Sequence, residues 1–448
     1  MASRDRQVRK AATAFAVAAF LTLIFTLAAA TAAQAASGDV LWTRAYQPKG
    51  YSLISNEHLA RGPGGDIWIA GSGEHGVGDA EYVVARIRSS GARRWVLALD
   101  TGLHQDQYLS DVAVDRFGNA VVTGYISRKV GMNLWYTAKI GPTGKVRWRR
   151  KLTPAGDKML VTANGVAVDR GGNVYVAGSI VRSGHSGDAA LVKYSPRGTL
   201  LWRRYINGTA NTRDEATDVV VDASGRVFVA ASVSYSDSSS DIVAARYTRG
   251  GRRVWVSRWN GPSATSSDHA TALAVSKAGI AVGGIAAQFS PLERGATVVW
   301  GLDGATKWGD PLTSIGNVWN LAVAINGSGA VAAAGKVFAP TIQSHFTRYT
   351  STGAFDFWRN ETGSANDGGC NAVRITSGGV VFAVGYLWET DGLSTYVAGC
   401  DGGAYDWFIA WRGSSSLRCT GEDLIVSSQS LYVAGTIGGR MSLQKVAR

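Results

Sequence analysis

A tryptophan recurs at nearly constant spacing along most of this sequence, 49 to 54 residues apart, and each copy follows a short turn that contains glycine. The copies are Trp42, Trp95, Trp148, Trp202, Trp255, Trp308, Trp358 and Trp407. A small residue within an apolar segment keeps the same spacing: Gly71, Gly124, Gly178, Ala231, Gly284, Gly335, Gly385 and Gly435. Two markers in phase indicate a repeat architecture, in which each unit buries its apolar face against its neighbours.

The third unit shows what one repeat contains. Residues Gly165–Asp169 alternate as a strand should, a glycine-rich turn follows, and Val174–Gly178 is rich in β-branched residues. Ala189–Tyr194 and Leu200–Tyr205 are the third and fourth apolar segments, and a second short turn separates them. Four antiparallel strands per unit predict the blade of a β-propeller.

Strand counting predicts how the ring closes. The chain opens with a lone tryptophan-bearing strand at Val40–Tyr46, and its last unit holds only three strands, the last of them Met441–Ala447. If the first strand completes the last blade, the sheet edge there is hidden. The predicted fold is all-β, a single β-propeller of eight four-stranded blades.

Two stretches carry a family resemblance. Asp111–Asn119 followed by Val121–Gly124 resembles the repeat of the secreted bacterial β-propeller (SBBP-type) family, and Gly198–Trp202 is similar to the ending of pyrroloquinoline-quinone-like repeats. The first resemblance implies a surface or secreted protein without an assigned role. The quinone-dependent dehydrogenases use adjacent cysteines and an acidic calcium site. The sequence has no adjacent cysteines, so neither a quinone nor calcium is expected as a cofactor.

The first 35 residues read as a signal peptide. A basic segment precedes the apolar run Ala11–Ala30, and Ala33–Ala35 offers the small residues that a signal peptidase recognises. Removing these residues would lower the formal charge from +13 to +10. We expect residues 36–448 to form the exported propeller, secreted or at the cell surface. Retention of the apolar run as a membrane anchor is the alternative.

The residue that opens each inner strand should lie at the mouth of the central channel. Polar residues at this position are His58, Asp111, Asp218, Asn320, Asn371 and Asp423. Such a ring would suit a cation or sugar hydroxyls, and these residues are the first candidates for ligand binding at the top face, although the periodicity of the unit alone favours a structural role. The alternative is that these side chains cap the loops entering the strands, as Asn and Asp commonly do.

Further out, the longer loops on the same top face also carry candidates. Asp268–His269 and Asp214–Glu215 occupy matching loops of neighbouring units, so the two pairs could converge, and Trp388 could stack on a sugar ring. A carboxylate and a histidine could perform acid–base chemistry, and the enzyme we then expect is carbohydrate-active. Because no nucleophile or phosphate-loop motif accompanies them, we assign no catalytic residue and no metal ligand, and favour binding.

Basic residues concentrate on the predicted outermost strands, at Lys145–Leu152, Trp202–Arg204 and Arg252–Trp255. Protection of exposed strand edges explains this pattern. Attraction to cell-wall polyanions or anionic headgroups is the functional alternative. Export makes nucleic acid an unexpected partner.

Three cysteines leave at least one unpaired. Cys370 and Cys419 both lie where inner strands begin, whereas Cys400 ends a strand at the opposite face. A strand of six residues spans about 20 Å, too far for a disulfide. We therefore expect either a Cys370–Cys419 disulfide or three free thiols.

The sequence thus predicts an exported, monomeric, non-catalytic propeller that binds a partner through its top-face loops. The partners considered are a cell-wall polyanion, a glycan or an envelope protein. An enzyme and an envelope assembly scaffold are the alternatives.

Overall fold

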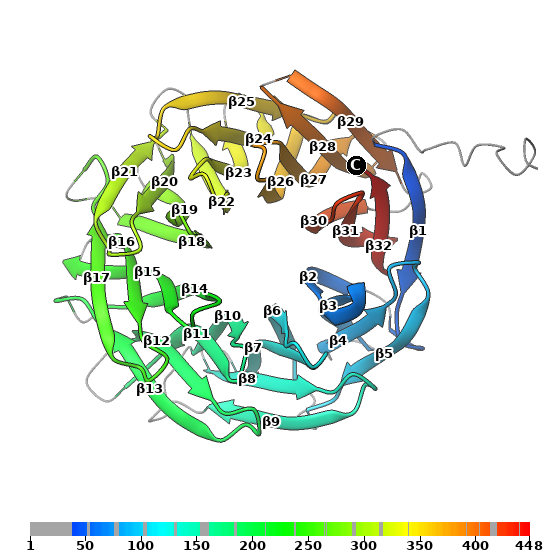
Figure 1. Cartoon of the computed structure of the whole chain (residues 1–448). Coiled ribbons are helices and arrows are strands. Elements are labelled where there is room, and N and C mark those ends of the chain that lie inside the picture. The colour runs from blue at the N-terminus through cyan, green and yellow to red at the C-terminus, as the bar shows by residue number, and fades with distance from the viewer. Residues whose placement is uncertain are drawn as a thin grey trace, which may run out of the picture.

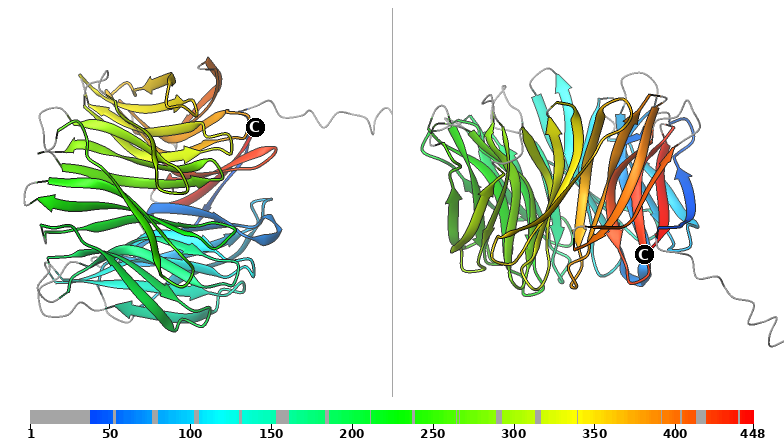
Figure 2. Two further views of the ribbon diagram at one scale, coloured as in Figure 1. Left: turned by 60° about the vertical axis from the view of Figure 1, so that its left-hand side comes forward. Right: turned by 90° about the horizontal axis from the view of Figure 1, so that it is seen from above.

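The structure is a computed structural model that describes residues 38–448 apart from 52–53, 76–79, 102–104, 130–131, 153–160, 183–185, 211, 237–238, 264, 266, 289–292, 313–316, 339, 391, 403, 413–418 and 439. The predicted signal peptide, residues 1–35, lies outside this range. The described residues form eight antiparallel four-stranded sheets arranged around a ring (Figure 1). Seen edge-on, the strands of each blade run between two faces that carry the turns and loops (Figure 2).

Each blade contributes one strand to each of four concentric layers. The innermost strands are β2 (Ile54–Arg61), β6 (Gln107–Val114), β10 (Thr162–Val168), β14 (Glu215–Val221), β18 (Ser267–Ser276), β22 (Val318–Ile325), β26 (Asp367–Ile375) and β30 (Cys419–Val426). The second strands are β3 (Ile67–Glu74), β7 (Ala120–Lys129), β11 (Val174–Ile180), β15 (Val227–Ser236), β19 (Gly279–Gln288), β23 (Val331–Phe338), β27 (Val381–Glu389) and β31 (Ser430–Ile437). The third strands are β4 (Ala80–Ile87), β8 (Met132–Ile140), β12 (Asp188–Tyr194), β16 (Ser239–Tyr247), β20 (Arg294–Trp300), β24 (Ile342–Tyr349), β28 (Gly392–Asp401) and β32 (Arg440–Ala447). The outermost strands are β5 (Arg93–Leu99), β9 (Val146–Leu152), β13 (Leu200–Ile206), β17 (Arg253–Trp259), β21 (Thr306–Pro311), β25 (Phe355–Glu361), β29 (Ala404–Arg412) and β1 (Val40–Tyr46). A one-turn 3-10 helix, η1 (Pro63–Gly65), joins β2 to β3.

Strand β1 closes the ring. It pairs antiparallel with β32, from Val40 opposite Val446 to Tyr46 opposite Met441, and the two strands lie side by side in Figure 1. The buried Tyr46 hydroxyl donates to the carbonyl of Gly91 in blade 1 at 2.6 Å. The closing strand therefore contacts both the last and the first blade. The predicted fold, eight blades and this closure are confirmed.

The recurring glycine on the second strand of a blade lies opposite a β-bulge in the innermost strand. Every innermost strand shifts register against its partner at this point, as between Leu109 and Asp111 in blade 2, and β18 shifts a second time between Ser267 and His269. A Cβ atom on Gly124 would lie 2.0 Å from the carbonyl oxygen of Tyr108, and one on Gly178 would lie 1.9 Å from that of Thr162. Glycine, which lacks a Cβ atom, lets the two backbones approach this closely, and blade 4 has alanine, Ala231, at the equivalent position.

The tryptophan marker joins neighbouring blades. The Trp148 indole donates to the carbonyl of Pro196 in the next blade at 3.0 Å. Gly198 in the same turn has a φ of 81°, and its added Cβ atom would lie 2.7 Å from the Trp148 ring. Trp95 and Trp255 make the equivalent hydrogen bonds at 2.9 and 3.2 Å. The spacing of this marker therefore reports contacts between blades.

Aspartates beside the turn between the first two strands pair with basic residues of the third strand in blades 1 and 2. Asp115 pairs with Lys139 of its own blade at 2.9 Å, and Lys139 also donates to the carbonyl of Gly172 in the next blade. Asp66 and Arg86 pair in the same way at 2.8 Å.

Candidate functional site

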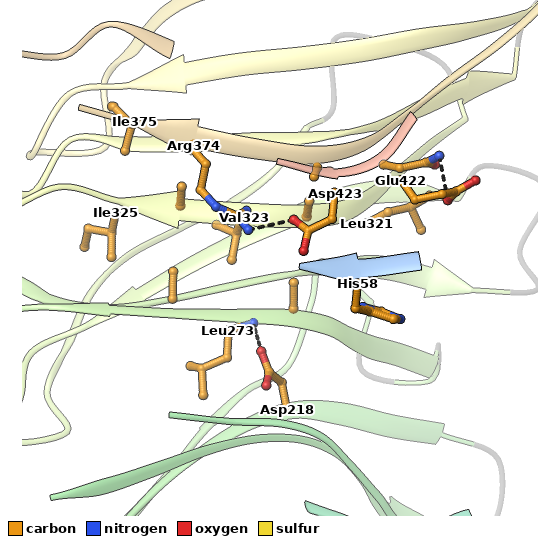
Figure 3. Close-up of a pocket in the computed structure, with 16 residues that line it drawn as sticks. His58, Asp218, Leu273, Leu321, Val323, Ile325, Arg374, Ile375, Glu422 and Asp423 are labelled. Carbon is orange, nitrogen blue, oxygen red and sulfur yellow. Dashed lines mark hydrogen bonds and ion pairs between the residues drawn. The ribbon is translucent and has the colours of Figure 1, made fainter. Parts of the chain in front are cut away.

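A pocket of about 470 Å³ lies in the central channel between the innermost strands. Strands β18 and β22 supply an apolar wall that includes Ala272, Leu321 and Ala322, and β26 adds Ala372 and Ile375 together with the polar Asn371 and Arg374. Strands β14, β30 and β2 supply polar side chains from the other side: Asp218, Glu422, Asp423 and His58 (Figure 3). The pocket therefore has an apolar wall and an acidic wall.

The carboxylates of the predicted ring connect adjacent blades. Asp218 Oδ1 accepts the N–H of Val219 on its own strand at 2.6 Å, and Oδ2 accepts the N–H of Leu273 in the next blade at 3.2 Å. Asp111 and Asp423 make the same two types of contact. These bonds support the capping interpretation. A carboxylate accepts about four hydrogen bonds, so acceptor positions remain for a ligand.

Two residues predicted for this ring lie elsewhere. In blades 6 and 7 the position equivalent to Asp111 is occupied by Ala322 and Ala372, because the bulge displaces the preceding residues. Asn320 is fully buried and donates to the carbonyl of Ala296 at 3.1 Å, so it does not face a ligand. The ring therefore has four polar residues rather than six.

Asn371 occupies the bulge itself. Its amide donates to the carbonyl of Gly421 at 2.9 Å and to Glu422 Oε2 at 3.1 Å. It still lines the channel pocket. The structure thus brings together four predicted residues, His58, Asp218, Asn371 and Asp423, at one cavity.

The channel alters the protonation of the groups it holds. Burial raises the pKa of Asp218 to about 6. Burial, and then the charge of Asp218, raise the pKa of Asp111 well above its ordinary value. Burial lowers the pKa of His58, which favours the neutral imidazole. Asp423 forms an ion pair with Arg374 at 2.8 Å.

A pair of glutamates at this site was not predicted from the sequence. Glu57 is 1% exposed and accepts a hydrogen bond from Thr436 at 2.8 Å. Burial, and then the charge of Glu422, raise the pKa of Glu57 to about 8. Each glutamate directly precedes a polar ring residue, His58 or Asp423, and this shared position is the signal that could have identified the pair.

The outer candidates divide between structural and accessible positions. Asp268 is fully buried, and its oxygens accept hydrogen bonds from the N–H groups of Ala287 and Gly261 at 3.0 and 2.5 Å. Contrary to the expectation from the sequence, it does not face a ligand. Trp388 is 39% exposed at the end of β27 and lines neither the channel pocket nor the pocket around His269.

His269 lines a second pocket, of about 330 Å³, with Arg213, Glu215 and several serines. Its Nδ1 lies 3.4 Å from Ser232 Oγ, and burial lowers its pKa. Arg213 and Glu215 form an ion pair at 3.1 Å. This pocket is polar throughout, unlike the channel.

The remaining histidines and cysteines are mostly structural where they are described. His345 is buried in β24, and burial lowers its pKa to about 4. His104 and His185 lie outside the described residues. Cys370, Cys400 and Cys419 are buried free thiols, so the Cys370–Cys419 disulfide is not formed. The Cys370 thiol instead donates to the carbonyl of Val384 within its own blade at 3.4 Å.

Among the described residues there is neither a cluster of metal ligands nor a membrane-spanning helix. No group of three or more His, Cys, Asp or Glu residues there is arranged to hold a metal ion. No helix in the same part of the chain is long and apolar enough to cross a membrane.

Comparison with known proteins gives one family match. The profile of the family described as "Outer membrane protein assembly factor BamB" matches residues 137–392. No curated protein matches the sequence. Among solved structures, Chaetomium thermophilum Sqt1 bound to the N-terminus of the ribosomal protein L10 is 13% identical, with a TM-score of 0.55. That alignment covers 92% of this chain and 100% of the other chain. Sqt1 of the same organism in another structure is 12% identical, with a TM-score of 0.55 and coverage of 92% and 99%. This similarity concerns the fold.

Proposed function

Because the chain belongs to the family of outer membrane protein assembly factor BamB, we propose that it is an exported, non-catalytic binding or scaffold module. Its partner contacts the top face and inserts a segment into the channel mouth. The apolar run and small-residue site before residue 36 support export. The description of the family supports a place in the cell envelope.

The two-sided channel pocket is the observation that carries this proposal. Small alanines on β18, β22 and β26 leave space on one side, while Asp218, Glu422 and Asp423 line the other. A rigid pocket with an apolar wall and a few convergent polar groups is typical of a binding site. A cationic group with an apolar stem fits both walls, because the stem can cover the alanines while the charge meets Asp218 and Glu422; Asp423 is already paired with Arg374.

A lysine or arginine side chain in an extended peptide has this chemistry. The propeller Sqt1 holds the N-terminus of another protein, so a ring of this fold can accommodate a peptide end. We therefore propose a protein partner that presents a basic residue beside apolar ones.

Selection of peptides from a random display library on the purified protein tests the proposal. Peptides with a basic residue flanked by apolar residues should be enriched. Their binding should be lost in Ala272→Trp, because this partly exposed alanine lines the pocket and an indole would fill it. Leu200→Trp, on an exposed outer strand, is the matched control and should bind normally. Equal binding to Ala272→Trp would refute the channel as the site.

Catalysis is the second candidate, favoured by the protonation states in the channel. Asp218, with its pKa near 6, and the neutral imidazole of His58 share one pocket and could act as acid and base. The test is turnover of glycans by the purified protein. Asp218→Asn should abolish such turnover, and the absence of turnover by the wild-type protein would reject this candidate.

A further inference from the structure

The outermost strands of the ring differ in charge between blades 1–4 and blades 5–8. The outermost strands of blades 1–4, β5, β9, β13 and β17, contain ten basic and no acidic residues. Those of blades 5–8, β21, β25, β29 and β1, contain four of each. The turns that lead into the first group add Arg88, Lys145, Arg197, Arg249 and Arg252. The two halves share one strand arrangement, so the difference is independent of the fold.

Edge protection does not account for this excess. Every outermost strand presents the same unpaired edge, and charge on such an edge discourages aggregation. Blades 5–8 have equally exposed edges with no net charge on these strands. Arg94 and Arg258 form ion pairs with Asp66 and Asp241 of their own blades, and the other eight basic residues still exceed what the edges of this ring require.

The basic residues of blade 2 form an ordered row. Lys145, Arg147, Arg149 and Lys151 alternate with less exposed residues, and all four are exposed. Residues two apart on a strand share one face and lie about 7 Å from each other. Arg149 and Lys151 share one face of β9, and Arg147, at a bulge in the strand, and Lys145, just before the strand, bring the row of exposed cations to four.

Apolar side chains lie among these cations. Leu200 and Leu201 at the start of β13 are 41% and 48% exposed, and Val254 on β17 is 38% exposed. A chain of phosphates would gain nothing from them. The C–H faces of sugar rings pack on such groups, and carboxylates on the same rings pair with arginine forks.

The convex shape of the outer rim of blades 1–4 favours a flexible linear ligand. The four outer strands lie along a convex arc that covers about half of the ring (Figure 1). A flat bilayer would touch only a small part of this arc, whereas a linear polymer can follow it. We propose that the outer rim of blades 1–4 binds a linear acidic polysaccharide that carries carboxylates. This surface is separate from the channel, so polysaccharide binding at the rim and peptide binding in the channel can be tested independently.

Titration calorimetry with polygalacturonate, a linear chain with one carboxylate per sugar, tests the proposal. Arg147→Gln/Arg149→Gln/Lys151→Gln should weaken binding at least about tenfold and make its salt dependence shallower, because fewer counterions are released. The matched control, Arg44→Gln/Lys307→Gln/Arg440→Gln, removes the same charge from exposed positions in blades 5 and 8 and should bind like the wild type.

Four results would overturn the proposal. The first is unchanged binding by the blade 2 variant, and the second is an equal loss in the control variant. The third is equally tight binding of methyl-esterified polygalacturonate, which lacks the charge. The fourth is tighter binding of duplex DNA or phosphatidylglycerol vesicles than of polygalacturonate, which would assign the surface to another class of partner.

Discussion

Blades 1–4 and blades 5–8 fold alike and differ in the polar groups that they present. At the ring position of the channel the first half carries His58, Asp111, Gly165 and Asp218, whereas blades 5–7 carry alanine and only blade 8 of the second half carries a polar residue, Asp423. On the outer rim the first half has ten basic residues against none acidic, and the second half has four of each. What recurs in both halves builds the blades. What occurs in one half alone is therefore the better candidate for function.

The largest expected effect comes from the strand that joins the two halves. Deleting residues 38–46 removes β1 and its pairing with β32, and should lower the free energy of unfolding by more than about 3 kcal/mol, beyond an ordinary point substitution. Differential scanning calorimetry measures the loss, with a protein that lacks only residues 1–35 as the control. An unchanged melting temperature would show that the halves hold together without ring closure.

A smaller effect is expected from the carboxylates that connect blades in the first half. Asp218→Ala leaves the N–H groups of Val219 and Leu273 without their acceptor, and should cost about 1–3 kcal/mol of stability. Asp218→Asn keeps one acceptor oxygen and should cost less. Blades 6 and 7 fold with Ala322 and Ala372 at this position. If chemical denaturation finds Asp218→Ala as stable as the wild type, the carboxylate is not a structural requirement in blade 4 either.

The sequence predicts the features that repeat and misses those that depend on one bulged residue. The tryptophan and glycine spacings are sufficient for the eight blades, because each marker serves a contact made in every unit. The bulge adds a residue without changing the apolar pattern, so Asn320 and Asn371 were assigned to a position that Ala322 and Ala372 occupy. The sequence places Asp268 in a loop, but its burial depends on N–H groups from other segments, Gly261 and Ala287, and the sequence does not reveal that contact.

The glutamate pair where blade 8 meets blade 1 predicts a pH effect. The pKa of Glu57 is about 8 in the folded protein and 4.5 ordinarily, so the folded state keeps a proton that the unfolded state loses. Its contribution to stability is complete below pH 4.5 and disappears as the pH rises through 8. From pH 6.5 to 7.5 the free energy of unfolding should fall by up to about 1.4 kcal/mol.

The control for this effect is Glu57→Gln, which cannot titrate and should make the dependence shallower, while Asp111, whose pKa is also raised, keeps its own contribution of the same sign. Histidines with lowered pKa, such as His345, affect stability only below about pH 6.5, outside this window. Urea denaturation at each pH measures the slope. A wild-type stability that rises over this range would contradict the assignment of a protonated Glu57.

The smallest expected effect concerns the charged rim itself. Arg147→Gln/Arg149→Gln/Lys151→Gln replaces exposed side chains, and blades 5–8 fold without net charge at their outer edges. The free energy of unfolding of the variant should therefore differ from that of the wild type by no more than about 0.5 kcal/mol for each substitution, as surface changes usually do.

Partial relief of the repulsion among the ten cations would make any change in stability favourable, and most so at low salt. Thermal unfolding at 20 and 300 mM NaCl (roughly a fourfold change in screening length) measures it. A destabilised variant would mean that these residues support the blade, and the contrast between the two halves would then be structural rather than functional.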